Sequence, residues 1–423
     1  MVVGTILLLA SYALPVESMS EHLSDSASIF EKEGTYPALS ELYPSTLDNF
    51  TDSKMLLASA YPGTEPLMEK AMMGYSHRLE NGDPVETLVA EYSYDGNSED
   101  LGNIMTTEYS RYWQGYLVIL KPLLCLFDYG TIRILNGVVQ VIVVLVVAMA
   151  MARKGQGIVI APFILSIIAL SPTATALSLQ YSSVFYISMF ATYFIVVKRE
   201  VLSGRQCAIF FFLIGMATSY FDFLTYPVMS LGFPLVVMAA FRKSDSPRSA
   251  FVFSIAMILV WFLGYGGMWA LKWVIASIAM NDSSIFSNAL NQVSVRSSIN
   301  SDVNDQHLVQ MGILDGLISN IQVFLSNPLS VFSVLVGLLC CVIGMVWGCY
   351  FSHAFRQVLP VVLPLAVAFS LPMLWYLAMG NHSCIHAWFT FRDLSVALFA
   401  LLVAASIILQ SCFQNSGTKV LRQ

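Results

Sequence analysis

Charged residues are scarce in this chain. Asp, Glu, Lys and Arg make up 11% of its 423 residues, whereas a soluble globular domain contains about a quarter. The chain has no Gly-rich phosphate loop of the Walker type, which argues against ATP hydrolysis. Its seven cysteines show no zinc-ligand spacing, and all except Cys384 lie in or beside apolar runs. The sequence therefore argues against a soluble domain and against a disulfide or zinc framework.

Long apolar runs are the main feature that the sequence does have. Hydrophobic residues make up 57% of the chain. Apolar stretches of roughly 17–25 residues, the length that crosses a bilayer as a helix, recur along it. This pattern predicts an all-α polytopic membrane protein with about ten transmembrane helices. The predicted spans cover residues 1–15, 131–152, 157–173, 178–197, 207–219, 224–241, 250–275, 329–350, 358–379 and 393–411.

The first apolar run, Val2 to Leu14, is short for a span and has no basic residues before it of the kind that begin a signal peptide. It is either a first span whose upstream residues lie outside this chain or a short tilted helix, and we favour the first. No internal repeat and no Ser/Gly-rich linker divides the sequence. We therefore predict one membrane domain over residues 1–423, made of a first span (1–15), an outer acidic loop (16–113), and an interfacial helix with nine further spans (114–423).

Acidic residues gather between Glu17 and Trp113, where 18 acids stand against five basic residues. Apolar residues at helical spacing predict that this loop begins with an amphipathic helix, through Val16, Met19, Leu23, Ala27 and Phe30. Aromatic residues around an apolar face at 111–128, interrupted by Pro122, indicate a helix lying at the membrane interface.

Basic residues alternate with the acidic segments along the chain. One set of connections between spans carries 11 basic residues and two acids, and the other carries the acidic loop and nearly all remaining acids. Because cytoplasmic loops are enriched in Lys and Arg, this alternation predicts that the acidic loop is outside and that both termini are cytoplasmic. The expected location is the plasma membrane.

Asp48 and Asp52 are the first of four polar clusters on the predicted outer side. They share one face if this piece of chain is helical. Paired carboxylates can supply a catalytic base or bind a divalent cation such as Mg or Mn, so we expect the catalytic residues here and leave the metal open. The alternative is that both are ordinary helix caps before the apolar run Met55 to Ala58.

Two further clusters offer substrate-binding side chains. Arg111, Tyr112 and Trp113 suit a lipid headgroup, since an Arg fork matches phosphate; the alternative is an anchoring belt at the interface. Asp222 and Lys272 are candidates because a charged side chain at membrane depth costs free energy, and such residues usually have a function. Asp222 could instead lie in the headgroup layer, and Lys272 could simply extend to it.

The last cluster contains His382, His386 and Arg392. A His-x3-His pair on a helix can bind a metal, but without a third ligand the pattern is a weak indication. Arg392 at the start of a span fits a cationic pocket for a phosphate group, which the two histidines would complete. The alternative is a polar turn with scattered histidines.

This layout resembles the GT-C superfamily of integral-membrane glycosyltransferases, with a first span, a large acidic outer loop, and many spans with polar residues at their outer ends. Four segments are also similar to those of an uncharacterised group of bacterial membrane proteins of this type: Leu47–Asp52, Arg111–Tyr116, Asp222–Pro227 and Asn381–Arg392. The resemblance implies a polyprenyl-phosphate sugar donor and reaction at the outer face. It leaves Glu17 and Glu21 as competing catalytic acids, because the superfamily often places its acid soon after the first span.

We therefore expect a membrane glycosyltransferase of the cell envelope that transfers a sugar from a polyprenyl-phosphate donor to a glycolipid, polymer or protein acceptor. The expected partners are the lipid bilayer and this donor. The alternatives are a transporter or flippase of lipid-linked sugars, which needs charged groups near the membrane midplane, and a non-catalytic assembly protein. The acidic polar surface argues against nucleic-acid binding.

Overall fold

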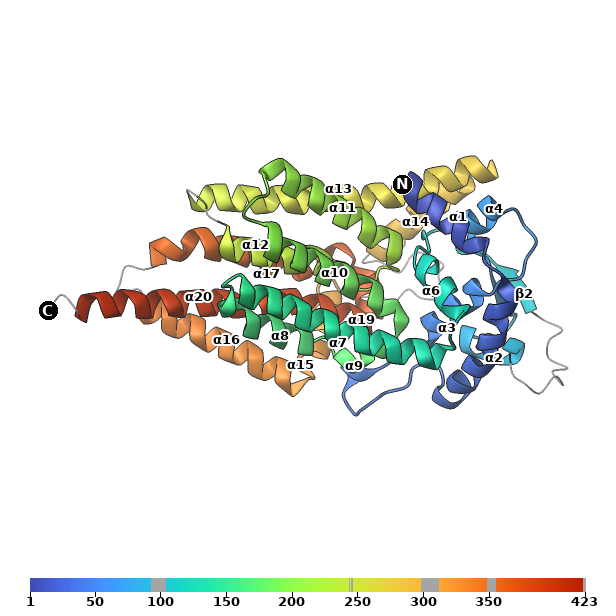
Figure 1. Cartoon of the computed structure of the whole chain (residues 1–423), viewed down its shortest axis with the longest axis horizontal. Helices are drawn as coiled ribbons and strands as arrows, with labels where there is room; N and C mark the ends of the chain where they lie inside the picture. The colour runs from blue at the N-terminus through green and yellow to red at the C-terminus, as the bar shows by residue number, and fades with distance from the viewer. Residues whose placement is uncertain (93–103, 243, 245, 298–311, 348–354, 421–423) are drawn as a thin grey trace.

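Two parts make up the molecule, a bundle of long helices and a group of short helices at one end of it (Figure 1). The computed structural model describes residues 1–92, 104–242, 244, 246–297, 312–347 and 355–420. Within these residues, six helices are long and apolar enough to cross a membrane, which confirms an all-α membrane protein. They are α7 (Tyr129–Arg153), α10 (Leu179–Lys198), α13 (Pro247–Met280), α16 (Pro328–Trp347), α17 (Phe355–Ala378) and α20 (Leu394–Val420), the last entered through α19 (Ala387–Thr390) and η5 (Phe391–Asp393).

The other predicted spans coincide with helices that are shorter or less apolar. They are α1 (Val2–Tyr12), α8 (Ile160–Ile168) after the turn η3 (Gly157–Val159), α11 (Gly204–Phe221) and α12 (Val228–Phe241). A short helix α9 (Pro172–Leu177) follows α8. α12 packs against α10, α17 and α20 and is buried over nearly its whole length, so its apolar residues contact protein. The count of ten spans stays a prediction.

The N-terminal helix α1 lies at the same end of the bundle as the short helices. Its 11 residues extend only about 16 Å, roughly half of a bilayer's apolar core. The hydroxyl of Tyr220, at the end of α11, donates a hydrogen bond of 2.6 Å to the carbonyl of Gly4. The chain then bends by 77° into α2 (Val16–Glu33). α1 and α2 pass the test for a span only as a bent pair, and a first span at 1–15 stays a prediction.

The segment from α2 to α6 forms a folded unit, which we call the cap. After α2 it contains η1 (Tyr43–Ser45), α3 (Asn49–Ser59), α4 (Leu67–Met73), β1 (Ser76–Leu79), α5 (Pro84–Tyr92), β2 (Ile104–Thr107) and α6 (Leu117–Leu124). β1 and β2 pair antiparallel, with Ser76 opposite Thr107. The predicted amphipathic helix is confirmed, because Met19, Leu23, Ala27 and Phe30 are buried along one face of α2. The cap therefore has a hydrophobic core of its own, which extends to the ends of α11 and α13.

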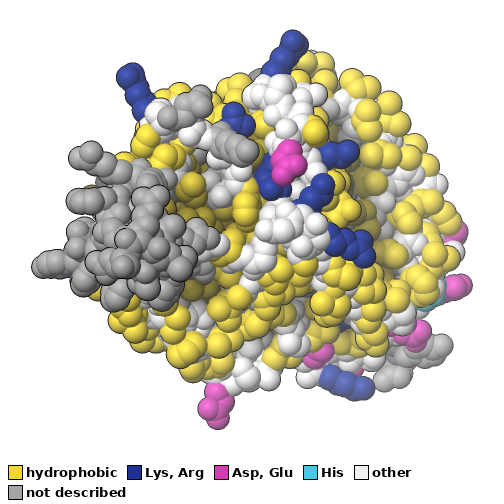
Figure 2. Space-filling view, turned by 60° about the vertical axis from the view of Figure 1, so that its left-hand side comes forward, with side chains coloured by type: hydrophobic (Ala, Val, Ile, Leu, Met, Phe, Trp, Pro, Cys, Tyr) yellow, Lys and Arg dark blue, Asp and Glu magenta, His cyan; other side chains and the backbone are white. Residues whose placement is uncertain are grey.

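Later parts of the chain return to the cap. α14 (Ser284–Ser297), α15 (Asp315–Leu325) and α18 (Gly380–Ile385) lie at this end of the bundle. The opposite end, which we call the basic end, carries Arg153, Lys154, Lys198, Arg199, Arg205, Arg242 and Arg248 at the termini of α7, α10, α11, α12 and α13. Figure 2 turns this end toward the viewer and shows Lys and Arg side chains gathered among apolar ones. The acidic and basic segments thus lie at opposite ends of the bundle.

Buried cations hold the cap together and fasten it to the bundle. Lys272 of α13 donates to the carbonyl of Met72 in the cap at 2.7 Å, and within the cap Lys121 of α6 donates to the carbonyl of Ser59 at 2.6 Å. These carbonyls lie at the C-terminal ends of α4 and α3, where backbone acceptors have no partner within the helix and a positive charge is favoured. Arg133 of α7 pairs with Glu33 of α2 at 2.9 Å. The contacts fix the position of the cap over the bundle.

Candidate functional site

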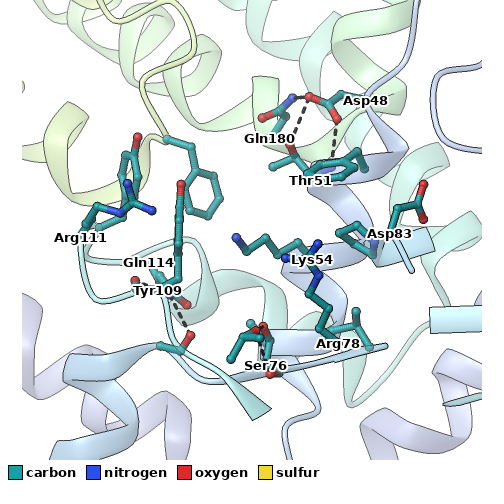
Figure 3. Close-up of a pocket in the computed structure, with 18 of the residues that line it drawn as sticks. Asp48, Thr51, Lys54, Ser76, Arg78, Asp83, Tyr109, Arg111, Gln114 and Gln180 are labelled. Carbon is teal, nitrogen blue, oxygen red and sulfur yellow. Dashed lines mark hydrogen bonds between the residues drawn. The ribbon is translucent and has the colours of Figure 1, made fainter. Parts of the chain in front are cut away.

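A cavity of about 920 Å³ lies between the cap and the adjoining ends of the bundle helices. Its wall is built from α3, β1, the segment after β2, the first residues of α10, the turn after α11, and α14, α18 and α19. Among the residues that line it are Tyr36, Asp48, Thr51, Lys54, Arg78, Tyr109, Arg111, Tyr112, Gln180, Arg296, His382, His386 and Trp388. Figure 3 shows part of this wall.

Among the residues that the structure describes, Asp48 is the buried one of three carboxylates that line the cavity; Asp83 and Glu108 are more exposed. It is the N-cap of α3, and its Oδ1 accepts a 2.9 Å hydrogen bond from the Thr51 amide while its Oδ2 accepts one from the Thr51 hydroxyl at 3.1 Å. The side-chain amide of Gln180 also donates to Oδ2. Burial raises the pKa of Asp48 to about 7, and the hydrogen bonds from Thr51 and Gln180 oppose the rise only in part. Asp48 can therefore gain and lose a proton near neutral pH.

Asp128, the N-cap of α7, is a useful comparison for Asp48. It accepts the same pair of hydrogen bonds, from the amide of Thr131 at 2.9 Å and from its hydroxyl at 2.6 Å. Asp128 is only half-buried; burial raises its pKa, but the hydrogen bonds from Thr131 and from nearby backbone amides together outweigh this and lower the pKa below its usual value. The N-cap hydrogen bonds by themselves therefore favour the ionised form. The raised pKa of Asp48 comes chiefly from its burial and further from the nearby charge of Asp52.

Asp52, the second predicted catalytic residue, is fully buried and does not line the cavity. Its carboxylate accepts hydrogen bonds from the amides of Leu179 at 2.8 Å and Gln180 at 3.0 Å, and from the hydroxyl of Tyr129. These amides are the unpaired donors at the start of α10. The structure thus separates the predicted pair: Asp48 faces the cavity, and Asp52 holds the first turn of α10 beside it.

The competing acids Glu17 and Glu21 are exposed on α2 and do not line the cavity. Arg111 and Tyr112 do line it, as the sequence predicts. Trp113 does not, because its indole is buried and donates a 2.8 Å hydrogen bond to the carbonyl of Met268 in α13. Of this predicted cluster, two residues belong to the cavity and the third joins the cap to the bundle.

Asp222 and Lys272 are both buried outside the cavity lining. Asp222 accepts hydrogen bonds from the amide and the hydroxyl of Thr225 and so closes the turn between α11 and α12. Burial raises the pKa of Asp222 to about 7, as it does for Asp48. Lys272 binds the end of α4. The structure therefore gives both residues contacts within the fold, away from the cavity.

His382 and His386 line the cavity, with their ring centroids 4.7 Å apart. A ring nitrogen of His382 lies 2.7 Å from the carbonyl of Leu224. Burial, together with His386 and Arg296, holds the pKa of His382 well below its usual value. His382 is therefore neutral at pH 7 and brings no positive charge to the cavity.

Arg392, predicted to join the two histidines, does not reach the cavity. Its guanidinium is fully buried and lies 4.0 Å from the ring centroid of Tyr181. It donates to the carbonyls of Leu170 and Trp388, both at 3.1 Å. Arg392 thus ties η5 to the segment after α8 and to α19, and the three predicted phosphate ligands do not converge.

Three cations in the wall, Lys54, Arg78 and Arg296, were not predicted from the sequence. Lys54 lies on α3, where Asp48, Thr51 and Lys54 follow at three-residue spacing and share one face, so helical periodicity could have indicated it. Arg296 lies on α14, and its guanidinium donates to the hydroxyl of Tyr112 at 2.5 Å. No local pattern points to Arg296, because its partner is 184 residues away in the sequence.

The part of the chain that the structure describes contains no group of three His, Cys, Asp or Glu residues placed to hold a metal ion. The cavity offers instead a buried carboxylate at Asp48, the more exposed carboxylates of Asp83 and Glu108, several basic side chains, and aromatic side chains that include Tyr36, Phe50 and Trp388. Comparison of this chain with protein-family models, with curated proteins and with solved structures gives no match.

Proposed function

We propose that this protein is a membrane glycosyltransferase whose reaction takes place in the cavity between the cap and the bundle. The observation that supports this most strongly is Asp48, a buried carboxylate with a pKa of about 7 at the wall of a cavity of about 920 Å³. A general base is most effective when its pKa is close to the working pH. The volume falls in the usual range of a small-molecule site.

In the proposed reaction Asp48 accepts the proton of an acceptor hydroxyl. The hydroxyl oxygen forms a bond to the anomeric carbon of the donor sugar, and the bond from that carbon to the phosphate oxygen breaks. The electron pair of the broken bond stays on the phosphate, which leaves. Aromatic side chains such as Tyr36 and Trp388, whose ring centroids lie 5.7 Å apart, provide apolar surface for a sugar ring. Positioning of the two substrates supplies much of the rate in such a transfer.

A polyprenyl-phosphate-linked sugar is the proposed donor. Apolar side chains cover the outside of the bundle; on α7, Ile134, Val138 and Val141 are more than half exposed, and such a surface suits lipid. The cavity lies at one end of this apolar surface, so a bound lipid could keep its chain in the bilayer and its headgroup in the cavity. With basic residues at the opposite end, the cavity would face outward from the plasma membrane.

Transport of lipid-linked sugars is the less favoured alternative. Alternating access places the substrate site near the middle of the spans. The lining residues from the candidate spans, Gln180, Trp388 and Phe389, all lie at span ends beside the cap. The described wall therefore favours a site at the membrane surface.

The test compares Asp48→Asn with Asp128→Asn in purified protein. Asn is a good N-cap, so both variants should keep their helices and their thermal stability. Asp48→Asn should lower sugar transfer from a polyprenyl-phosphate donor by roughly 10²–10⁴-fold, the usual loss for a general base. Asp128→Asn should transfer at the wild-type rate. Unchanged transfer in Asp48→Asn would refute the assigned role.

A further inference from the structure

Three cations from separate parts of the chain meet inside the cavity. We call Lys54 of α3, Arg111 after β2 and Arg296 of α14 the cation cluster. They surround the rings of Tyr109 and Tyr112, which stack with centroids 5.2 Å apart. Figure 3 shows Lys54 reaching toward the wall that carries Tyr109 and Arg111. The Lys54 amine lies 3.6 Å from the Tyr109 ring centroid, and the Arg111 guanidinium carbon lies 5.2 Å from it.

No carboxylate of the described residues pairs with this cluster. The ion pairs within 4.0 Å in that part of the chain are His77–Glu91, Arg133–Glu33 and Arg199–Glu200. Burial lowers the pKa of Lys54. Tyr109 opposes this effect, and the positive charges of Arg111, Arg78 and Arg296 act in the same direction as burial. The cluster therefore brings several positive side chains together where they are partly shielded from water. A bound anion would offset their mutual repulsion.

The number of charges indicates which anion fits. A sugar linked through one phosphate carries about one negative charge, and one linked through a diphosphate carries about two. Transfer of the sugar adds one more, so a leaving diphosphate reaches about three, a charge that the three cations of the cluster, with Arg78 in the same wall, can offset. The two Arg forks also match phosphate oxygens in pairs. His382 is neutral and Arg392 lies elsewhere, so neither supplies this charge.

Building on the proposed function, we propose that the cation cluster binds a diphosphate group, so that the donor is a polyprenyl-diphosphate-linked sugar. Lys54, which contacts the Tyr109 ring, and Arg296, which donates to the Tyr112 hydroxyl, would hold the leaving diphosphate. Asp48, on the same helix as Lys54, would take the proton of the acceptor. The proton and the developing negative charge are then handled by separate groups of residues.

The test measures binding of polyprenyl diphosphate and polyprenyl monophosphate of equal chain length to the full-length protein in detergent. The wild type should bind the diphosphate lipid about tenfold or more tightly than the monophosphate lipid. Lys54→Met and Arg296→Gln should each weaken diphosphate binding roughly 10- to 100-fold, because each removes a charge-assisted contact, and should reduce the preference. Lys154→Met, an exposed lysine at the basic end, is the matched control and should bind as the wild type does.

Thermal unfolding identifies variants that do not fold, and Arg111→Gln is used in place of any variant that does not.

The proposal would be overturned if the wild type bound the two lipids with equal affinity, or if folded variants of the cluster bound the diphosphate lipid as tightly as the wild type. Inorganic pyrophosphate should compete weakly; if it binds as tightly as the lipid, the ligand is a free diphosphate and the lipid-linked assignment fails. Diphosphate-lipid binding without sugar transfer would leave this site standing and refute the proposed function. Sugar transfer that depends on Asp48 but not on the cation cluster would support the proposed function and refute the diphosphate site.

Discussion

Asp48 and Asp128 show how far the surroundings of one carboxylate decide its chemistry. Each caps a helix and accepts the same two hydrogen bonds from a threonine three residues later. The pKa of Asp128 is lowered, whereas burial raises the pKa of Asp48 from 3.8 to about 7. Capping a helix is a structural role and accepting a proton is a chemical one, and Asp48 is placed to perform both. The role of helix cap that the sequence offers as an alternative is thus compatible with the catalytic one.

The pKa of Asp48 predicts the pH dependence of transfer. The base must be ionised, so kcat/KM should rise with pH, pass half of its maximum near pH 7 and level off above it. Steady-state rates between pH 5 and pH 9 measure this rising limb. A flat profile over that range would contradict a base with this pKa.

The contribution of Asp48 to folding stability should fall with rising pH, whereas its contribution to the transfer rate should rise. A raised pKa means that the folded state holds the proton more tightly than the unfolded state. The contribution of Asp48 is therefore fully present below pH 3.8 and is lost as pH rises through about 7. Asp48→Asn should lose less stability than the wild type between pH 4 and pH 8, as measured by thermal unfolding. Asp128→Asn, which removes a lowered pKa, should not reduce this pH dependence.

Asp52→Asn should destabilise the fold. The amides of Leu179 and Gln180 donate to different oxygens of the Asp52 carboxylate, and Asn replaces one of these acceptors with an NH₂ group, which can only donate. A buried donor without its acceptor costs about 1–3 kcal/mol. Thermal unfolding should show a clearly lower midpoint for Asp52→Asn than for Asp48→Asn, because Asn at position 48 can still serve as the N-cap of α3. An unchanged midpoint for Asp52→Asn would show that the start of α10 does not depend on Asp52.

At the scale of elements, single side chains join helices that are far apart in the sequence. Lys272 on α13 reaches the end of α4, about 200 residues earlier, and Asp52 on α3 holds the start of α10. The ends of helices are where backbone groups lack partners, so a buried charge placed there satisfies a helix and fixes its position at once. The cavity wall is built between elements that are held in this way.

Lys272→Met tests this account of how the cap is fastened. Met keeps most of the apolar stem but leaves the carbonyls of Ala71 and Met72 without their donor, which should cost about 1–3 kcal/mol. Hydrogen exchange of the amides in α4 should become faster than in the wild type. Lys154→Met serves as the control, since that lysine is exposed at the basic end. Unchanged exchange in α4 would show that the cap is held by apolar packing alone.

The whole molecule has an acidic cap at one end and a basic end at the other, with apolar surface between them (Figures 1 and 2). This distribution predicts how the protein sits in a membrane. Lys and Arg are retained on the cytoplasmic side, so the cap should face outward. The proposed acceptor and donor would then meet on the outer face.

Cysteine labelling in intact cells tests the orientation. Ser28→Cys, on the exposed side of α2 in the cap, should react with a membrane-impermeant thiol reagent. Ser249→Cys, exposed at the basic end, should react only after the membrane is opened. The unsubstituted protein, measured in parallel, corrects for its own cysteines. The reverse pattern would place the cavity on the cytoplasmic side and would contradict the proposed reaction at the outer face.

The sequence by itself determined the class of protein, most of the long helices and the amphipathic face of α2. These features follow from apolar run length and from helical spacing, which are local properties. It also indicated Asp48, Arg111, Tyr112, His382 and His386, all of which line the cavity. Composition and spacing thus located one wall of the site.

Only the tertiary structure decided which polar residues share the cavity. Asp52 and Arg392 have the same local signals as residues that line it, yet both are turned toward backbone groups of other helices. Arg296 has no such signal, because it meets Tyr112 only when α14 packs over the cap. A cavity is formed by contacts between residues far apart in the sequence, so neither helical period nor residue type reveals which side chains enter it.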